Sequence, residues 1–170
     1  LQQGDTIAIV SPAGNLNNKV AEIEQSVKLL NSWNLNVVLG KNIFNQNNEF
    51  AGTDEERAAD FQKALDNPNI KAIWCARGGY GTVRILDKLD YTAFKEHPKW
   101  IIGYSDITAL HNQIHNIGFE TIHAIMGISL DNNCEYNEVN VASFKDAIFG
   151  NHLKYTIKGS VDNRPGIATG

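Results

Sequence analysis

The sequence predicts a three-layer α/β fold, in which a mostly parallel five-stranded sheet has helices on both faces. Three observations support this. Short apolar runs alternate along the 170-residue chain with stretches whose apolar residues recur at helical spacing. The segments between the runs are long enough for the helical crossovers that parallel strands require. Glycine follows closely after each of the first four runs, as expected where strands end in turns.

The first two strands are expected at 6–10 and 36–39, on either side of one helix. The run Thr6-Ile7-Ala8-Ile9-Val10 ends at the breaker Ser11-Pro12-Ala13-Gly14. The second strand, Asn-Val-Val-Leu, is closed by Gly40 and followed by an asparagine-rich loop through Asn48. Helical spacing between the strands is carried by Val20, Ile23, Val27 and Leu30.

A second helix and a buried strand follow. Thr53 and Glu56 have the spacing of a capping box, which predicts a helix start, and Asn67-Pro68 predicts its end. The strand at 70–76 is almost wholly apolar and leads into the loop Arg77-Gly78-Gly79-Tyr80-Gly81. The buried helix face is expected to carry Ala58, Phe61 and Leu65.

The remaining elements repeat the pattern. A short helix is expected after Gly81, a strand at 100–103, a helix capped by Gly118, a strand at 120–124 and a last helix before Gly150. The apolar residues that define the three helices are Val83, Leu86 and Leu89; Ile107, Leu110, Ile114 and Ile117; and Val141, Phe144 and Ile148.

The alternation of strands and helices ends at residue 150, so we expect one α/β domain over 1–150. Residues 151–170 are expected to be a linker and the start of a further domain that this chain lacks. Within them, 153–157 alternates like an exposed strand and 163–166 has the composition of a turn.

Composition excludes several classes of function. The formal net charge is −4, and lysine and arginine are scattered, which argues against nucleic-acid binding. No apolar run approaches the roughly 20 residues of a membrane span. Residues 1–5 show no signal peptide, although a trimmed signal stays open because the chain begins with Leu1. Cys75 and Cys134 are far apart, which favours reduced thiols and a cytoplasmic location. The sequence indicates no cofactor.

Four polar or glycine-rich segments directly follow predicted strands. They are Gly14, the 77–81 loop, Ser105 and His123. Ligands of parallel α/β sheets bind beyond the carboxyl ends of the strands, so these segments are expected to share one functional edge.

Ser105 is the candidate nucleophile. The segment Trp100-Ile101-Ile102-Gly103-Tyr104-Ser105-Asp106-Ile107-Thr108 runs from an apolar strand through a glycine to a serine at a helix start. This resembles a nucleophile elbow, although Ile107 replaces the last glycine of G-x-S-x-G. The alternative is a serine that simply caps the helix.

Four motifs together resemble the LD-carboxypeptidases, a serine peptidase family that also contains the microcin-immunity peptidases. The resemblance covers residues 4–150. The motifs are Ile9-Val10-Ser11-Pro12-Ala13-Gly14, Phe50-Ala51-Gly52-Thr53-Asp54, Arg77-Gly78-Gly79-Tyr80-Gly81 and Gly103-Tyr104-Ser105-Asp106.

The resemblance implies a flavodoxin-like fold, with Ser105 as the nucleophile and a Glu and a His from a C-terminal domain completing a triad. This fragment alone would then be inactive. The family reaction removes terminal D-alanine from a murein tetrapeptide, in cytoplasmic cell-wall recycling. One departure concerns the loop after the fifth strand. The family commonly has His-Gly-Pro there, whereas this chain has His123-Ala124-Ile125.

The groups around Ser105 suggest individual roles. The backbone N–H of Asp106 is expected to donate to the oxyanion, while its carboxylate caps the helix that follows. The second donor is expected at Gly79, because the Gly78-Gly79 loop lets backbone approach the substrate; a tight turn needing positive φ is the alternative. Arg77 would bind a substrate carboxylate, or else hold a loop by pairing with an Asp or Glu.

The histidines and aromatic residues are less specific. His123 is expected to line the pocket, with the role of triad base as a second interpretation. His111 and His115 are spaced like a metal pair but have no third ligand, so no metal is predicted. Tyr80 and Tyr104 are expected as pocket walls or as plain packing. The other candidate bases are His97 and His152, and Cys75 is expected to be an inert core thiol.

Several alternatives stay open. The microcin-immunity branch would cleave a peptidyl-nucleotide amide instead. A non-catalytic flavodoxin-like module could hold phosphate in the Gly78-Gly79 loop, although no phosphate-loop motif is present. An amidotransferase-like domain would need cysteine in place of Ser105. The expected partners are a murein peptide and the absent C-terminal domain, with a homodimer open, and neither nucleic acid nor membrane.

Overall fold

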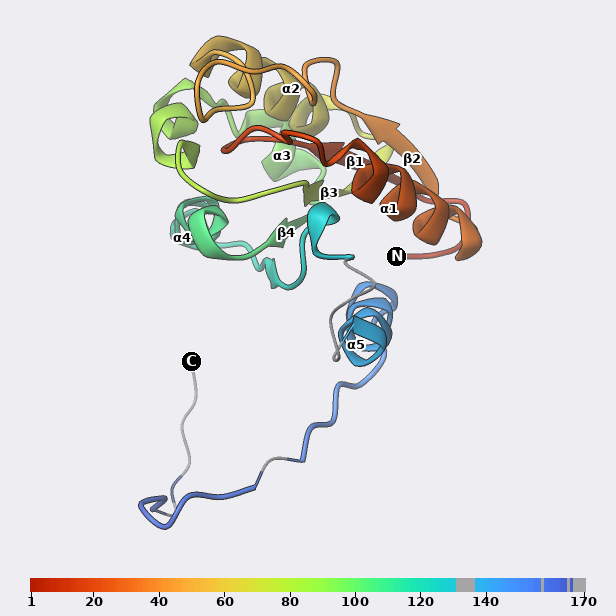
Figure 1. Cartoon of the computed structure of the whole chain (residues 1–170). Helices are drawn as coiled ribbons and strands as arrows, with labels where there is room; N and C mark the ends of the chain where they lie inside the picture. The colour runs from red at the N-terminus through yellow and green to blue at the C-terminus, as the bar shows by residue number, and fades with distance from the viewer. Residues whose placement is uncertain (131–136, 157, 165, 167–170) are drawn as a thin grey trace.

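The computed structural model describes residues 1–130, 137–156, 158–164 and 166. Its centre is a five-stranded sheet in the order β2-β1-β3-β4-β5, with every neighbouring pair parallel. The predicted α/β class is confirmed, and the sheet is entirely rather than mostly parallel (Figure 1). The strands are β1 (Thr6–Val10), β2 (Asn36–Leu39), β3 (Ile70–Cys75), β4 (Trp100–Gly103) and β5 (Ile122–His123).

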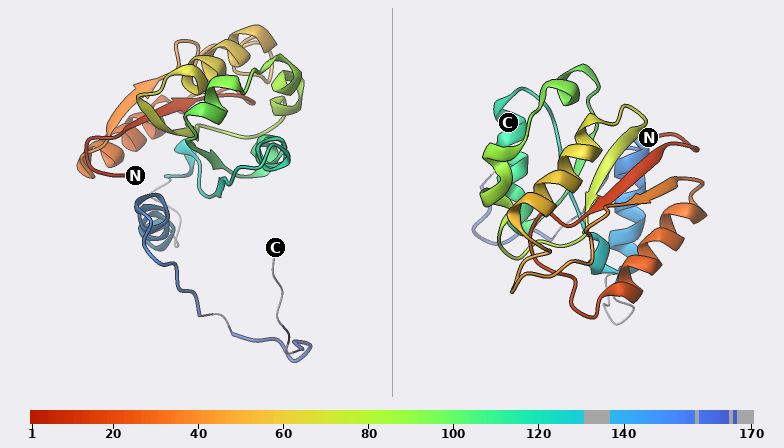
Figure 2. Two further views of the ribbon diagram at one scale, coloured as in Figure 1. Left: turned by 180° about the vertical axis from the view of Figure 1, so that it is seen from behind. Right: turned by 90° about the horizontal axis from the view of Figure 1, so that it is seen from above.

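Helices connect the strands and cover both faces of the sheet, as predicted (Figure 2). The α-helices are α1 (Val20–Ser32), α2 (Asp54–Asp66), α3 (Thr92–Glu96), α4 (Thr108–Asn116) and α5 (Asn137–Phe149). Shorter 3₁₀ helices are η1 (Thr82–Lys88), η2 (Ser105–Ile107) and η3 (Gly127–Ser129). No helix in the described part of the chain is long and apolar enough to cross a membrane.

Alternating strand residues divide the core into two layers, as the two-residue period of a strand requires. On one face Ile7, Ile9 and Trp74 pack with residues of α1 and α5. On the other, Ala8 and Ile73 pack with residues of α2, α3 and α4. Because both faces are covered, the strands are nearly continuous apolar runs, as parallel strands usually are.

Helix α2 begins as the sequence predicted. The Thr53 hydroxyl accepts from the Glu56 N–H at 3.2 Å, and the Glu56 carboxylate accepts from the Thr53 N–H at 2.8 Å. Gly118 follows the C-terminal end of α4. It has φ +92° and its N–H donates to the His115 carbonyl, which confirms it as the cap of that helix.

Several expectations were wrong in detail. The helix after Gly81 is 3₁₀, and its buried residues are Thr82 and Ile85, whereas Val83 is exposed. The expected strand at 120–124 is reduced to β5, and α3 was not predicted. No strand forms at 153–156, and Ile157 lies outside the described residues, as does Cys134. After α5 the described residues run away from the body as an extended segment (Figure 1).

Candidate active site

Ser105 occupies a strained turn at the carboxyl end of β4. Its φ is +61°, a left-handed conformation that costs a residue with a side chain roughly 1–2 kcal/mol. The turn brings Ile107 so close to Gly103 that an added Cβ would lie 2.9 Å from Ile107 Cγ2. Only glycine therefore fits at position 103. Ser105 is exposed and its hydroxyl makes no hydrogen bond to a described residue. This is the geometry of an elbow, and the serine does not act as a side-chain cap.

Two backbone N–H groups have no partner among the described residues, one next to Ser105 in the sequence and one in the glycine loop. Neither the Asp106 nor the Gly79 N–H donates to another described residue. Asp106 lies in η2, which runs directly into α4, so its N–H is at the positive end of a helix. A pair of unpaired donors near a serine is what an oxyanion hole requires.

The glycine loop lies against the serine turn. A Cβ added to Gly78 would be 3.4 Å from both Ser105 Cβ and Asp106 N. The Gly78 carbonyl accepts from the Gly14 N–H at 3.0 Å, which ties the loop to the segment after β1. Gly79 has φ +109°, which is the positive φ of the tight turn given above as the alternative. Approach of this loop's backbone to a substrate stays a prediction.

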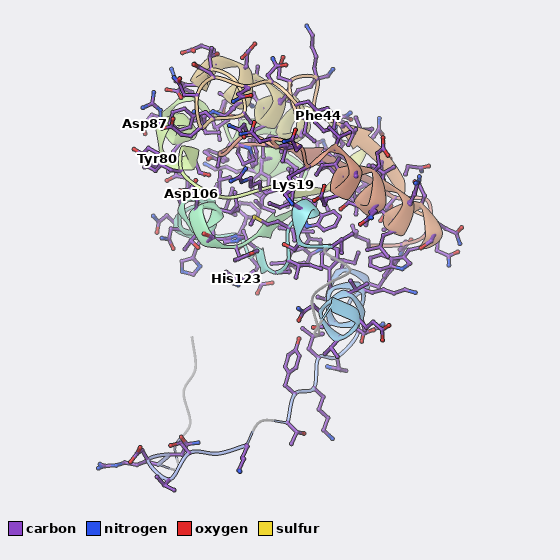
Figure 3. The ribbon with its side chains drawn as sticks, viewed as in Figure 1. Lys19, Phe44, Tyr80, Asp87, Asp106 and His123 are labelled. Carbon is purple, nitrogen blue, oxygen red and sulfur yellow. The ribbon has the colours of Figure 1, made fainter. Side chains whose placement is uncertain are left out.

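The Asp106 carboxylate does not cap the helix that follows it, contrary to expectation. Asp106 Oδ2 accepts from the Thr82 N–H at 3.0 Å, at the start of η1. The side chain therefore joins the serine turn to the end of the glycine loop. Figure 3 shows Tyr80, Asp106 and His123 along one side of the body.

Arg77 donates from Nη1 to the Asn15 carbonyl and so holds the loop after β1. An acidic partner was expected for a loop-holding role, but none is found for Arg77 within the described residues. Tyr80 is 54% exposed and its ring lies 6.0 Å from that of Phe50. Tyr104 is also exposed, so both tyrosines can face a ligand.

The histidines separate into buried and exposed groups. His111 is buried, and its Nε2–H donates to the Gly103 carbonyl at 2.9 Å. Burial lowers the pKa of His111, so the ring is neutral at pH 7. His123 is exposed, with its ring 6.2 Å from Tyr104 and 5.9 Å from His111. His115 is exposed, and no group of three metal-ligating side chains occurs among the described residues.

Cys75 is fully buried in β3, and burial raises the pKa of its thiol. The thiol is therefore protonated and unreactive at neutral pH, as expected for a core cysteine.

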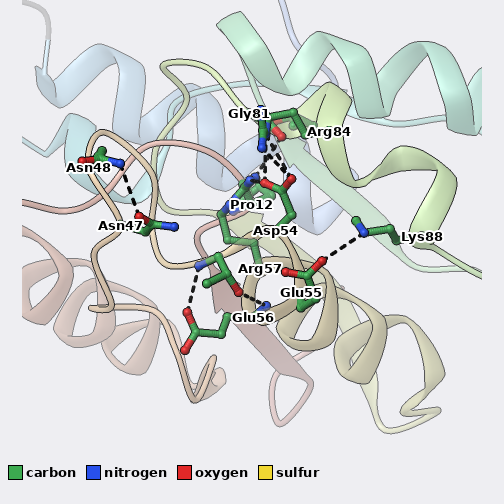
Figure 4. A network of polar contacts seen from close by, with 12 residues as sticks. Pro12, Asn47, Asn48, Asp54, Glu55, Glu56, Arg57, Gly81, Arg84 and Lys88 are labelled. Atoms are coloured by element: carbon green, nitrogen blue, oxygen red, sulfur yellow. Dashed lines mark hydrogen bonds and ion pairs between the residues drawn. The ribbon is translucent and has the colours of Figure 1, made fainter.

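Arg57 belongs to the site's scaffold and was missed in the sequence. The residue is 1% exposed, and Nη1 donates to the carbonyls of Pro12 and Gly81, the latter at 2.8 Å. Nη2 pairs with Asp54, which Arg84 also binds (Figure 4). The available signal was the helical spacing of Arg57 to Phe61, which places the arginine on the buried stripe of α2.

Comparison with known proteins identifies the family. The family model described as the LD-carboxypeptidase N-terminal domain matches residues 7–124. A Bacillus subtilis protein named "Probable murein peptide carboxypeptidase" is 37% identical over 160 residues, covering 92% of this chain and 49% of the relative. The murein tetrapeptide carboxypeptidase of Pseudomonas aeruginosa is 33% identical, covering 73% of this chain and 40% of the relative.

Solved structures agree with the sequence matches. The microcin C7 self immunity protein MccF superimposes with a TM-score of 0.82 at 28% identity, covering 95% of this chain and 52% of that one. Muramoyltetrapeptide carboxypeptidase from Oxalobacter formigenes gives 0.71 at 25% identity, covering 84% and 47%. The chain thus spans about half the length of the curated relatives it matches. It belongs to the LD-carboxypeptidase family and carries that family's N-terminal domain.

Proposed function

We propose that this chain supplies the nucleophile-bearing half of a serine carboxypeptidase that releases terminal D-alanine from a murein tetrapeptide. The observation that carries the proposal is the left-handed, exposed Ser105, which is followed by the free Asp106 N–H and lies against the glycine loop that carries the free Gly79 N–H. A strained residue with an unpaired hydroxyl at the edge of a parallel sheet is typical of a catalytic elbow.

The reaction follows from this geometry. Ser105 Oγ attacks the carbonyl carbon between the L-centre of the diamino acid and D-alanine, and a histidine takes the hydroxyl proton. The carbonyl oxygen, now negative, accepts from the Asp106 and Gly79 N–H groups. When the C–N bond breaks, the histidine returns the proton to the amine of D-alanine. Water then hydrolyses the acyl-enzyme by the same sequence.

The base and its orienting acid are proposed to come from a C-terminal domain that follows residue 150. No histidine in the described residues makes a hydrogen bond to Ser105, and His111 is committed to the Gly103 carbonyl. Residues 1–150 are therefore proposed as a domain that is inactive alone. The extended residues after α5 are proposed as the start of the linker.

Substrate contacts are proposed for the side chains that border the serine. One guanidinium nitrogen of Arg77 binds Asn15, which leaves its other N–H groups for a substrate carboxylate. Gly78 is proposed to admit the peptide backbone. Tyr80, Tyr104 and His123 are exposed and are proposed to line the pocket.

A second substrate is favoured by one observation. The fold superimposes well on MccF, whose structures include complexes with glutamyl sulfamoyl guanosine and aspartyl sulfamoyl adenosine. The same serine and donors could serve the cleavage of a peptidyl-nucleotide amide, since the chemistry at the carbonyl is identical.

The test is D-alanine release from murein tetrapeptide by a protein that carries this chain followed by its C-terminal domain. We expect release by the wild type and none above background by Ser105→Ala. Release that persists in Ser105→Ala would exclude the serine as the nucleophile. A folded wild type that releases nothing would exclude the murein substrate, and a peptidyl-nucleotide amide would be assayed next.

A further inference from the structure

A single peptide group in the glycine loop is held from both ends. The Gly81 carbonyl accepts from Arg57 Nη1 at 2.8 Å, and the Thr82 N–H of the same peptide donates to Asp106 Oδ2 at 3.0 Å. The planar Gly81–Thr82 peptide is thus hydrogen-bonded at its carbonyl to the buried Arg57 guanidinium and at its N–H to the Asp106 carboxylate. Hydrogen bonds to charged groups are about twice as strong as neutral ones.

The backbone of the loop needs these two hydrogen bonds to limit its motion, because two of its residues are glycines with positive φ. Gly79 has φ +109° and Gly81 has φ +124°, and glycine moves between backbone regions more freely than any other residue. An unrestrained loop would let the Gly79 N–H point in many directions. Gly81 itself cannot be replaced, since an added Cβ would lie 2.8 Å from Phe50 Cδ1 and 3.0 Å from Arg57 Nη1.

Arg57 is in turn fixed by its surroundings. Its other contacts are the Pro12 carbonyl and Asp54, and its guanidinium lies 5.0 Å from the centre of the Phe50 ring. Arg84 binds the same Asp54 (Figure 4). Its guanidinium lies 5.1 Å from the centre of the same Phe50 ring. The Arg57 guanidinium therefore has little freedom to follow a moving loop.

We propose that Arg57 and Asp106, acting through the Gly81–Thr82 peptide, are positioning residues that fix the Gly79 N–H in the orientation that the proposed oxyanion hole needs. The inference rests on the proposed function and adds to it a role for two side chains. Asp106 then contributes twice: its backbone N–H is one oxyanion donor, and its carboxylate sets the position of the other. Because the oxyanion forms only during the reaction, the carboxylate should affect kcat far more than KM.

The test compares Asp106→Ala with Asp90→Ala in the protein that carries this chain and its C-terminal domain. Asp90 makes the same kind of bond at a distant site: its Oδ1 accepts from the Thr92 N–H at 2.8 Å, at the start of α3. We expect Asp106→Ala to lower kcat for D-alanine release about 10- to 100-fold with KM within about twofold. Asp90→Ala should keep kcat. Equal kcat values for the two variants would overturn the proposal.

Conservative variants separate positioning from folding. Asp106→Asn keeps an oxygen that can accept from the Thr82 N–H, so it should recover part of the rate lost in Asp106→Ala. If Asp106→Ala does not fold, Asp106→Asn is compared with Asp90→Asn, and only the former should be slower. Arg57→Lys should lower kcat too, and its effect should combine with Asp106→Asn less than multiplicatively, since both act on one peptide.

Two readouts need no knowledge of the substrate. A fluorophosphonate probe labels an activated serine, so Asp106→Ala should slow the labelling of Ser105. Amide hydrogen exchange at Thr82 should become faster in the same variant. If the probe labels Ser105 in the wild type but no D-alanine is released, the murein substrate is rejected. The positioning role can still be measured from the labelling rates. An unchanged labelling rate in Asp106→Ala would reject the positioning role itself.

Discussion

Ser105 has a backbone conformation that glycine would adopt without strain. Its φ of +61° costs roughly 1–2 kcal/mol for a residue with a Cβ, and Ile107 leaves no room for a Cβ at Gly103, two residues earlier. The protein therefore tolerates local instability at the residue proposed to react. Such strain is common at catalytic positions, where surrounding structure enforces it.

This strain leads to a stability prediction at the same residue. Ser105→Gly should be more stable than Ser105→Ala by about 1 kcal/mol in the free energy of unfolding, because only glycine relieves the left-handed conformation. Both variants remove the hydroxyl, so neither should release D-alanine. Urea denaturation of the two proteins measures the difference. Equal stabilities would show that the turn carries no strain.

The candidate site could be predicted only in part from single residues. The order of glycine, serine and helix in the sequence led directly to the strained turn at Ser105. The partner of the Asp106 carboxylate could not be predicted, because Thr82 lies 24 positions away and meets it only once β3 and β4 are paired. Arg57 was missed because an arginine on a helix is normally solvated, and its acceptors are backbone carbonyls without a sequence signature.

At the scale of elements, strand positions were easier to predict than the ends of the connections. β1 and β2 have the expected bounds because their apolar runs are closed by strong breakers. β5 is shorter than expected because it pairs only with β4, through two register pairs, and lies at the edge of the sheet. α3 has five residues, which is too short for a periodic pattern to reveal.

The end of α2 depends on a lysine from another element. Lys99, immediately before β4, is buried and donates to the carbonyls of Ala64, Leu65 and Asn67 at 2.7–3.0 Å. These are carbonyls that a helix end leaves without partners, and a cation there also complements the helix dipole. The side chain thus joins α2 to the start of β4.

Lys99→Met should lower the free energy of unfolding by about 1–3 kcal/mol, because it leaves buried carbonyls without a donor. Burial lowers the pKa of Lys99 to about 8 from an ordinary value of 10.5. Between pH 8 and 10.5 Lys99 is protonated in the unfolded chain but mostly neutral in the folded protein. The free energy of unfolding of the wild type therefore increases as the pH rises through this range. The deficit of Lys99→Met should therefore grow from pH 8 to 10.5. Urea denaturation across this range measures it.

Lys28→Met is the control, since Lys28 is exposed on α1 and is not among the groups that shift the pKa of Lys99. Its effect should stay within about 0.5 kcal/mol at every pH. A deficit of Lys99→Met that shrinks as pH rises would contradict the assigned direction of the pKa shift.

At the scale of the whole molecule, α5 completes the core although it is the last helix. Phe144 is buried and stacks on Trp74 at 4.9 Å, and Ile148 is buried beside it. Without α5, one face of the sheet would expose Trp74. The hydrogen bonds of the described residues after residue 150 to α5 are those of Asn151 to Asp146 and the one between Tyr155 and Ser143.

A protein ending at residue 150 should therefore unfold at the same urea concentration as one ending at residue 170. Ending the chain at residue 135 removes α5 and should abolish cooperative unfolding, because the apolar face that α5 covers becomes exposed. Phe144→Ala in the 1–150 protein is a milder test, with an expected loss of about 3–5 kcal/mol. A markedly less stable 1–150 protein would place the domain boundary beyond residue 150.

The strand order also has a consequence for synthesis of the chain. β1 lies between β2 and β3, and the two register partners Val10 and Cys75 are separated by 65 positions. At roughly 5–20 residues per second, a ribosome needs about 3–13 s to pass from one to the other. Throughout that interval at least the β3-facing edge of the nascent β1 is unpaired, so a bound chaperone would protect it most before β3 leaves the exit tunnel.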